Sequence, residues 1–182
     1  MSEMFSRRVF LRGLSVVAAA AALTACSSTN EAVNQALIEG AVGGIVATDC
    51  KIGRSRYWAA NATVPVYEIS FRIVMTNVSS KPVTLSGDNF ATTLDGTPIP
   101  PFNFSARDVG DADIWRTYDS LTIRPGEERS VALAYEISQS TYDSWYKSSR
   151  TVAVSFTCGN QRVTYTKNSR SDEITVSDIE TL

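Results

Sequence analysis

Along most of the chain, apolar and polar residues alternate with a period of two. This is the pattern of a β-strand that buries one face and exposes the other. The clearest run covers residues 67–76, where aromatic and aliphatic side chains at odd positions alternate with side chains that are polar at every even position except Val74. The same alternation returns at residues 131–137, 152–158 and 163–165. The pattern predicts half-buried strands with one solvated face.

The beginning of the body carries a similar signal. Val46, Thr48, Cys50 and Ile52 occupy alternate positions, so we expect them to share one face of a first strand. Asp95-Gly96 lies between two short β-prone segments and predicts a tight hairpin, and Pro125-Gly126 predicts a turn. Seven or so short strands with turns between them favour an all-β fold, an antiparallel β-sandwich.

Helical spacing is confined to two places. Tyr142, Trp145 and Tyr146 stand at i, i+3 and i+4 within residues 140–149, which predicts a short helix. Residues 31–39 have a weaker helical pattern and are expected to form a short N-terminal helix or a tether. At the other end, residues 168–182 are polar and are expected to form a loose tail or an edge strand.

The first 25 residues differ from the rest. Arg7, Arg8 and Arg12 precede an uncharged, alanine-rich run at residues 13–24. Twelve helical residues reach roughly 18 Å, which is short of the roughly 30 Å hydrocarbon core of a bilayer. The segment therefore predicts an export signal and not a stable transmembrane anchor.

Two motifs refine this interpretation. Ser6-Arg7-Arg8-Val9-Phe10-Leu11-Arg12 resembles the twin-arginine export signal, and Leu23-Thr24-Ala25-Cys26 resembles the bacterial lipobox. The resemblance implies export in a folded state, cleavage after residue 25 and lipidation of Cys26. The alternative is a chance cysteine after an ordinary cleavage site.

These motifs predict a protein of the cell envelope, extracytoplasmic and anchored to the membrane by lipid. Ser27 after the cysteine is compatible with a Gram-positive or a Gram-negative host. The expected organisation is a signal peptide at 1–25, a lipidated cysteine and tether at 26–41, a sandwich at 42–167 and the tail at 168–182.

Composition narrows the chemistry. The 182 residues include 17 Lys and Arg, 19 Asp and Glu and no His, a net charge of −2. Loss of three Arg and one Glu with residues 1–25 leaves 14 basic and 18 acidic side chains, a net charge of −4. This balance gives no support for nucleic-acid binding. Without histidine, the chain has no imidazole base or ligand, and we expect no cofactor.

Three cysteines occur in the chain. If Cys26 carries lipid, Cys50 and Cys158 remain, each on the expected inward phase of its strand. An exported protein meets an oxidising environment, so we predict a Cys50–Cys158 disulfide. Two separate buried thiols are the alternative.

Two longer segments carry a family resemblance. Residues 71–86 have the order strand, Asn, turn, Lys-Pro-Val-Thr-Leu, and residues 121–136 have Pro-Gly-Glu followed by an apolar strand. Both resemble segments of small immunoglobulin-like domains on bacterial surface lipoproteins of unknown function, and a secreted mycobacterial antigen is similar. The resemblance covers about residues 41–166. It implies an immunoglobulin-like sandwich and provides no catalytic residues.

Candidate site residues are few. Four aromatic residues near predicted loops could form a ligand patch, with core filling or loop anchoring as the alternative: Trp115, Tyr118, Trp145 and Tyr146. Asp108, Asp111 and Asp113 offer oxygen ligands for Ca²⁺ but lack the EF-hand spacing, so a solvated loop is the simpler interpretation.

Two further patterns carry other chemistry. Lys51, Arg54 and Arg56 lead into Tyr57-Trp58, a combination that can bind anionic polymers or lipid headgroups, or simply end a strand. Ser144-x-x-Lys147 matches the nucleophile motif of penicillin-binding proteins, but the partner motifs of those enzymes are missing.

Three functions follow from these patterns. The first is a lipid-anchored, non-enzymatic binding or interaction module of the envelope, with a small ligand or an envelope protein as its partner. The second is a structural or assembly partner in the envelope. The third is an enzyme that uses carboxylates alone, with Asp108, Asp111 and Asp113 as candidates.

Overall fold

The computed structural model describes residues 40–58, 63–101, 103–109 and 115–182. The signal peptide, Arg7 and Arg8, Cys26 and the segment at 31–39 lie outside these residues, so their interpretation stays a prediction. Among the described residues, no helix is long and apolar enough to cross a bilayer.

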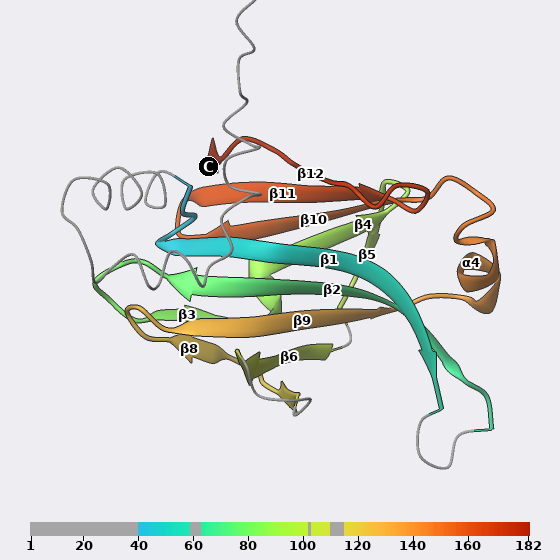
Figure 1. Cartoon of the computed structure of the whole chain (residues 1–182), viewed down its shortest axis with the longest axis horizontal. Coiled ribbons are helices and arrows are strands. Elements are labelled where there is room, and N and C mark those ends of the chain that lie inside the picture. Colours follow the sequence, from blue (N-terminus) through green and yellow to red (C-terminus); the bar gives the residue numbers. More distant parts are fainter. Residues whose placement is uncertain (1–39, 59–62, 102, 110–114) are drawn as a thin grey trace, which may run out of the picture.

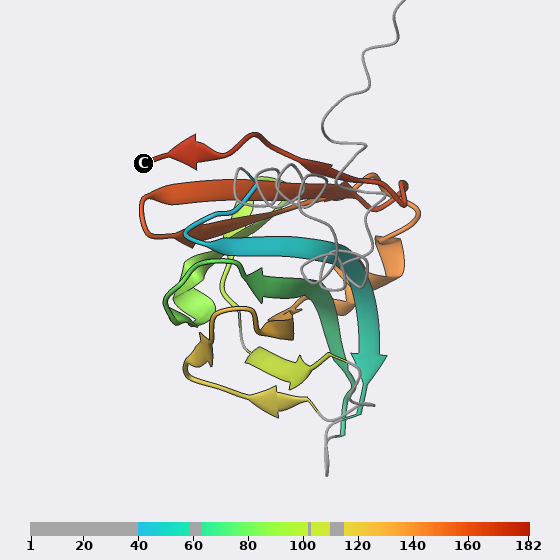
Figure 2. The same ribbon diagram turned by 60° about the vertical axis from the view of Figure 1, so that its left-hand side comes forward.

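The described chain folds into two large antiparallel sheets and a small two-stranded one, β3-β8 (Figure 1). One sheet has the strand order β1-β2-β9-β6-β7, and the other has the order β12-β11-β10-β4-β5, with β13 also paired to β11. In Figure 1, β4 and β5 pass behind β1 and β2, and the turned view of Figure 2 shows the two layers from another side. The antiparallel β-sandwich predicted from the alternation is confirmed.

The bounds of the elements are as follows. The first sheet contains β1 (Ile45–Tyr57), β2 (Val66–Asn77), β6 (Asn103–Asp108), β7 (Arg116–Thr117) and β9 (Glu128–Glu136). The second contains β4 (Phe90–Leu94), β5 (Thr97–Ile99), β10 (Thr151–Cys158), β11 (Gln161–Asn168), β12 (Ile174–Val176) and β13 (Glu180–Thr181). The remaining elements are the paired strands β3 (Val83–Leu85) and β8 (Leu121–Ile123), the 3₁₀ turn η1 (Gly87–Asn89) and the helix α4 (Gln139–Ser144).

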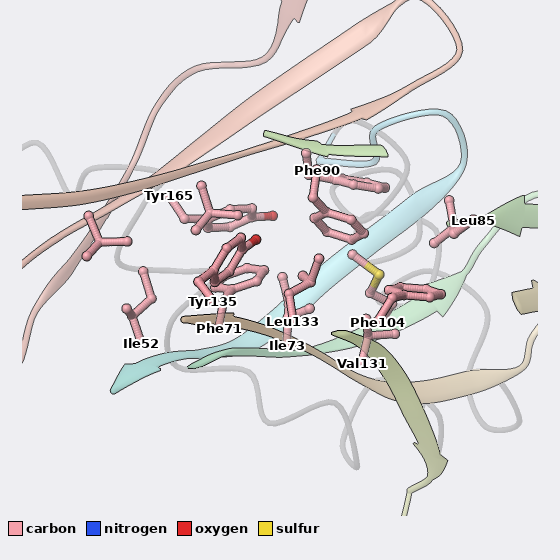
Figure 3. Packing of buried hydrophobic residues seen from close by; sticks show 14 of the residues in the cluster. Ile52, Phe71, Ile73, Leu85, Phe90, Phe104, Val131, Leu133, Tyr135 and Tyr165 are labelled. Atoms are coloured by element: carbon pink, nitrogen blue, oxygen red, sulfur yellow. The ribbon is translucent and has the colours of Figure 1, made fainter. Parts of the chain in front are cut away.

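The core lies between the two sheets, as the alternation predicts. Ile69, Phe71, Ile73 and Met75 of β2 are all at most 2% exposed, and they pack with inward residues of β9, β10 and β11. Figure 3 shows Tyr135 of β9 and Tyr165 of β11 facing each other across the core. The Thr92 hydroxyl donates a hydrogen bond of 2.6 Å to Tyr135 Oη, which supplies the buried phenol with a partner.

The prediction that Val46, Thr48, Cys50 and Ile52 share one face is wrong. Thr48 pairs with Val74 whereas Lys51 pairs with Arg72, so β1 holds one extra residue between these pairs. Asp49 takes φ 48° at this bulge. Because one extra residue exchanges the two faces of a strand, Val46 and Thr48 lie on the opposite side of β1 from Ile52, which points into the core with Cys50 packed against that core. Val46 is nevertheless only 5% exposed.

The other local predictions mostly agree with the structure. Asp95-Gly96 forms the β4–β5 turn with φ 51° and 80°, and α4 overlaps the first half of the segment expected to be helical, ending before Trp145 and Tyr146. In the C-terminal segment, β12 and β13 both pair with β11 at the sheet edge. The strands β6 and β7 were not predicted.

Asp95 does more than turn the chain. Its carboxylate accepts hydrogen bonds of 2.8 Å from Arg150 Nη1 and from the Thr151 amide. The hydrogen bond from Arg150, together with that from the Thr151 amide, lowers the pKa of the Asp95 carboxyl. The turn is therefore tied to the start of β10 by an interaction that needs an ionised carboxylate.

We expect Asp95→Asn to lower the free energy of unfolding by about 0.5–1 kcal/mol at neutral pH. Asn-Gly is as good a turn as Asp-Gly, so the change isolates the charge. The pKa of the Asp95 carboxyl is lower in the folded state than its unfolded value of about 3.9, so the ionised carboxylate stabilises the fold at pH values above about 3.9. This stabilisation is lost as the pH falls through the pKa of the folded state. Urea unfolding at pH 7 and pH 2.5 should show the difference shrinking at low pH, and a constant difference would contradict this role.

Candidate functional site

The four aromatic residues singled out in the sequence lie in different surroundings. Trp145 is 1% exposed and belongs to the core, and Tyr118 packs against the core while its amide donates to the Phe104 carbonyl at 3.0 Å. Tyr146 is 62% exposed beside α4. Only Trp115, which is half-buried, lies on a sheet face together with charged side chains. The structure does not bring the four residues into one groove.

At the α4 end of the sandwich, Arg54 joins β1 to the helical segment. Its guanidinium carbon lies 4.1 Å from the ring centroid of Tyr142 and 4.7 Å from that of Tyr146, and Nη1 donates to the Tyr142 carbonyl. The ring of Tyr67 packs against that of Tyr142, with 5.1 Å between ring centroids and a tilt of 54°. These contacts hold α4 on the sandwich and leave Arg54 half-buried.

Trp115 is the centre of a second cation–aromatic cluster. Its ring centroid lies 4.9 Å from the guanidinium carbon of Arg107 and 5.8 Å from that of Arg72. Arg107 comes from β6 and Arg72 from β2, two strands away. The indole therefore gathers two positive charges from separate strands onto one side of the sheet.

This side is the outward face of the β1-β2-β9-β6-β7 sheet, which we call the outer face. The strand register places Lys51, Arg72, Ala132, Ser105 and Thr117 in one row across five strands. Directly opposed residues of antiparallel strands point to the same side, so the whole row faces outward. A neighbouring row contains Gly53, Ser70, Ala134 and Asn103.

The outer face thus has small side chains at its centre and charged side chains at its margins. Its central side chains are absent or small, at Gly53, Ser70, Ala132 and Ala134, and all four residues are half-buried. Lys51 and Arg72 beside them are exposed. A hollow of about 250 Å³ lies over β1 and β2 and is lined by Gly53, Ser55, Ser70, Lys51, Arg54, Arg72 and Ile52.

A second hollow, of about 330 Å³, lies where β1 begins and has no charged residue in its lining. It is bordered by Ala41, Gly44, Val78, Ser79 and Gln161. The hollow on the outer face is the one with positive charge at its margin.

The Cys50–Cys158 disulfide is not formed, and both residues are free thiols. Cys158 lies against Gly43, 3.8 Å from its carbonyl oxygen, whereas Cys50 lies close enough to Tyr165 to influence its ionisation. Tyr165 pairs with Val154 of β10, and Val154 lies four residues, or roughly 13 Å, before Cys158 on the same strand. The place near Tyr165 where Cys50 lies is therefore far from Cys158. Bridged cysteines need α-carbons within about 7 Å, so the alternative of two separate thiols describes the structure.

The surroundings of both thiols disfavour the reactive form. Burial, with the nearby Asp49 carboxylate, raises the pKa of the Cys50 thiol to about 12, and burial also raises the pKa of Cys158. A thiolate is the form that attacks a substrate or binds a metal. Neither cysteine is therefore set up as a nucleophile.

The predicted acidic site is only partly visible. Asp108 ends β6 and forms an ion pair with Arg129, while Asp111 and Asp113 lie outside the described residues. Within the described ranges, no three residues of the His, Cys, Asp and Glu types come together as a metal site would require. Asp108 is thus engaged by a cation on the neighbouring strand β9.

Ser144 of the Ser-x-x-Lys match takes part in the end of α4. Its hydroxyl donates to the Thr141 carbonyl at 3.3 Å and accepts from Arg150 Nη2 at 3.1 Å. A serine nucleophile needs a base that removes its proton. Here the hydroxyl proton is directed to a main-chain carbonyl, which is a structural role.

Sequence reasoning missed Arg72, Arg107 and Gly53 as site residues. In the sequence, Arg72 is only one of the polar positions in the run at residues 67–76, and β6, which carries Arg107, was not predicted. The signal that could have found them is the outward phase of β2, where Arg72 is the one basic residue and follows Ser70. Its neighbours across the sheet depend on strand order, which alternation does not provide.

Comparisons with known proteins identify no family. No known protein family matches the chain, and no curated protein matches it either. Among solved structures, it is similar to the yjhA protein of Bacillus subtilis, with 13% identity over 64% of this chain and 74% of that chain and a TM-score of 0.40.

Two further structures show a similar degree of likeness. One is a candidate lipoprotein, ycdA, of Bacillus subtilis, with 10% identity over 72% of this chain but only 38% of that chain and a TM-score of 0.42. The other is an uncharacterised β-sandwich protein of Clostridium difficile, with 15% identity over 68% of this chain and 83% of that chain and a TM-score of 0.40.

Proposed function

We propose that this protein is a non-enzymatic binding module of the bacterial cell envelope, anchored through lipid at Cys26, with an immunoglobulin-like sandwich and the outer face as its recognition surface. The observation that carries the proposal is the gathering of Lys51, Arg72, Arg107 and Trp115 around a low, small-residue surface. Arginine and tryptophan are enriched where proteins bind their partners.

The arrangement of charge supports a binding role for this face. The chain as a whole is acidic, with a net charge of −2, yet Lys51 and Arg72 are exposed side by side in one row. Two like charges directly opposite one another destabilise a sheet. An anionic group bound between them would relieve that repulsion, so binding of an anion at this pair is favourable.

The non-enzymatic part of the proposal is supported by the chemistry of the described residues. The thiols are held in their protonated form by burial, Ser144 is hydrogen-bonded as part of α4, and Asp108 is paired with Arg129. Catalysis of acyl or glycosyl transfer would need an activated nucleophile or a pair of free carboxyl groups. These groups have structural partners instead.

We expect Cys26→Ala to abolish membrane attachment. Lipidation with two or more acyl chains anchors a protein stably, since each buried CH₂ contributes about 0.8 kcal/mol. After cell fractionation, the wild-type chain should be in the membrane fraction, and mass spectrometry should show an acylated Cys26 at its N-terminus. The variant should appear as a released protein or an unprocessed precursor. An unmodified thiol at position 26 of the native protein would contradict the proposal.

Assembly with an envelope protein is the alternative function. A photo-crosslinking residue introduced at Ser70 on the outer face and, as a control, at Thr175 on β12 distinguishes the two in living cells. Crosslinks from Ser70 to envelope glycan support recognition, and a single protein neighbour crosslinked from Ser70 supports assembly. No crosslink from Ser70, or the same products from both sites, would contradict the outer face as the recognition surface.

A further inference from the structure

We infer that the outer face binds an anionic glycan, a sugar polymer that carries carboxylate or phosphate groups. The inference rests on the proposed function, because it assigns a ligand class to the same face. It is argued from three features of that face: the extent of its positive charge, the polar character of its low surface, and the position of its aromatic ring.

The positive charge extends across several strands. Lys51 lies on β1, Arg72 on β2 and Arg107 on β6, and strand spacing places β1 and β6 roughly 14 Å apart. Asp49 lies 3.1 Å from Lys51 in an exposed pair, which is a weak competitor for an incoming anion. The next outward row beyond Ser70 holds Glu68 and Glu136, and Glu68 accepts a hydrogen bond from Ser55, so the positive side of the face is the one with Lys51, Arg72 and Arg107. A polymer with repeated charges can contact all three cations at once, whereas a single small anion cannot.

The surface beside Lys51 and Arg72 is formed by small residues, and Ser70 provides a hydroxyl group there. Ser70 stands beside Ala132 and Ala134, and nothing lies within 4 Å of a Cβ added at Gly53, whereas Ser105 is buried and its hydroxyl donates to the Ala132 carbonyl. Serine hydroxyls can both donate and accept hydrogen bonds, as sugar hydroxyls do. A flat, extended chain of sugar rings can therefore lie on this surface without displacing a side chain.

Trp115 adds the third feature. Its half-buried ring is held by the two guanidinium groups, so it is positioned before any ligand arrives. An aromatic ring offers an apolar face for the C–H side of a sugar, while the neighbouring arginines pair with acidic substituents. The two kinds of contact together suit an acidic sugar better than a neutral one.

Other anionic partners fit this face less well. The strands β2 and β9 are interior to the sheet, so strand addition is open only at the edge strands, and a peptide added along β1 would lie beside the sheet and not over Arg72 and Trp115. The central residues Gly53, Ser70, Ala132 and Ala134 offer no large aliphatic group for insertion among lipid chains. An anionic glycan uses the charge, the Ser70 hydroxyl and the ring at once.

The test measures binding by the purified, full-length mature lipoprotein in detergent with three polymers. Polygalacturonate presents carboxylates, poly(glycerol phosphate) presents phosphates, and dextran of matched length is neutral. At 50 mM NaCl, calorimetry should detect one or both of the anionic polymers but not dextran. Binding should weaken as salt is raised, because exposed charges are screened. The anionic polymer that binds more tightly shows whether the natural glycan carries carboxylate or phosphate groups.

Variants assign the binding to the outer face. R72Q/R107Q should weaken binding at least tenfold, and Lys81→Gln with Lys147→Gln, which removes the same charge at two exposed positions elsewhere, should stay within twofold of wild type. Gly53→Glu should weaken binding more than Gly53→Gln, because both fill the hollow but only one adds a negative charge. Circular dichroism of each variant checks that it is folded.

The inference is overturned if neither anionic polymer binds at 1 mM repeat unit, if dextran binds equally well, or if the control pair weakens binding as much as R72Q/R107Q. These failures are distinguishable from failure of the proposed function. If the Ser70 crosslinker captures envelope material while no polymer binds, the recognition surface stands and the ligand class is wrong.

Discussion

Asn77→Ala is expected to lower the free energy of unfolding by about 3–5 kcal/mol, since each buried polar group left without a partner costs about 1–3 kcal/mol. Asn77 is 0% exposed, and its Nδ2 donates to the carbonyls of Lys81 and Ile123, both at 2.8 Å. Its Oδ1 accepts from the amide and hydroxyl of Ser79 at 2.9 and 2.7 Å. One side chain thus joins the turn after β2 to β8.

Urea unfolding followed by tryptophan fluorescence measures this effect. Asn160→Ala provides the control, because Asn160 is exposed in the β10–β11 turn and its loss should cost less than about 0.5 kcal/mol. A similar small cost for Asn77→Ala would show that the turn does not depend on the buried amide.

Gly43→Ala is expected to destabilise the protein by about 2–4 kcal/mol, the combined cost of left-handed backbone strain and an overpacked contact. Gly43 has φ 58°, and an added Cβ would lie 2.5 Å from Cys158 Sγ and 2.8 Å from the Cys158 carbonyl oxygen. The Gly43 amide also donates to Gln161 Oε1 at 2.9 Å. The residue is pressed against the end of β10, which leaves no room for a methyl group.

Gly159→Ala separates the two causes. Gly159 has φ 61°, close to that of Gly43, but no atom lies within 4 Å of an added Cβ. The free energy of unfolding of Gly159→Ala should therefore fall only by the cost of backbone strain, about 1–2 kcal/mol. Cys158→Ala should recover part of the Gly43→Ala loss in the double variant, because it removes the nearest atom. Equal losses for the two glycines would contradict the close contact.

The parts of the fold that the sequence predicted are those with long, regular alternation. In β2 and β9 the apolar residues are large and uninterrupted, so burial of one face decides the register. The strand β6 escaped prediction because its inward residues are Phe104 and Ala106, and one of these is too small to give a clear signal. The bulge at Asp49 was invisible because the extra residue leaves the local alternation apparently intact.

The candidate site was less predictable than the fold. Trp115 was singled out for its residue type, but its partners Arg72 and Arg107 are 43 and 8 positions away and meet only through the strand order β2-β9-β6. The inferred disulfide failed for a related reason. The alternation predicts that each cysteine points into the core, but it does not predict where along its strand each cysteine lies relative to the other strand. In the structure Cys158 lies beside Gly43, away from Cys50.

The outer face as a ligand surface is tested most directly by an NMR titration with polygalacturonate. The chain has three tryptophans, so three indole N–H signals report on different places. We predict that the Trp115 signal and the amides of Gly53, Ser70 and Ala132 shift in a saturable way while the signal of buried Trp145 does not. Shifts confined to β11 and β12, with the Trp115 signal unmoved at saturation, would contradict the account.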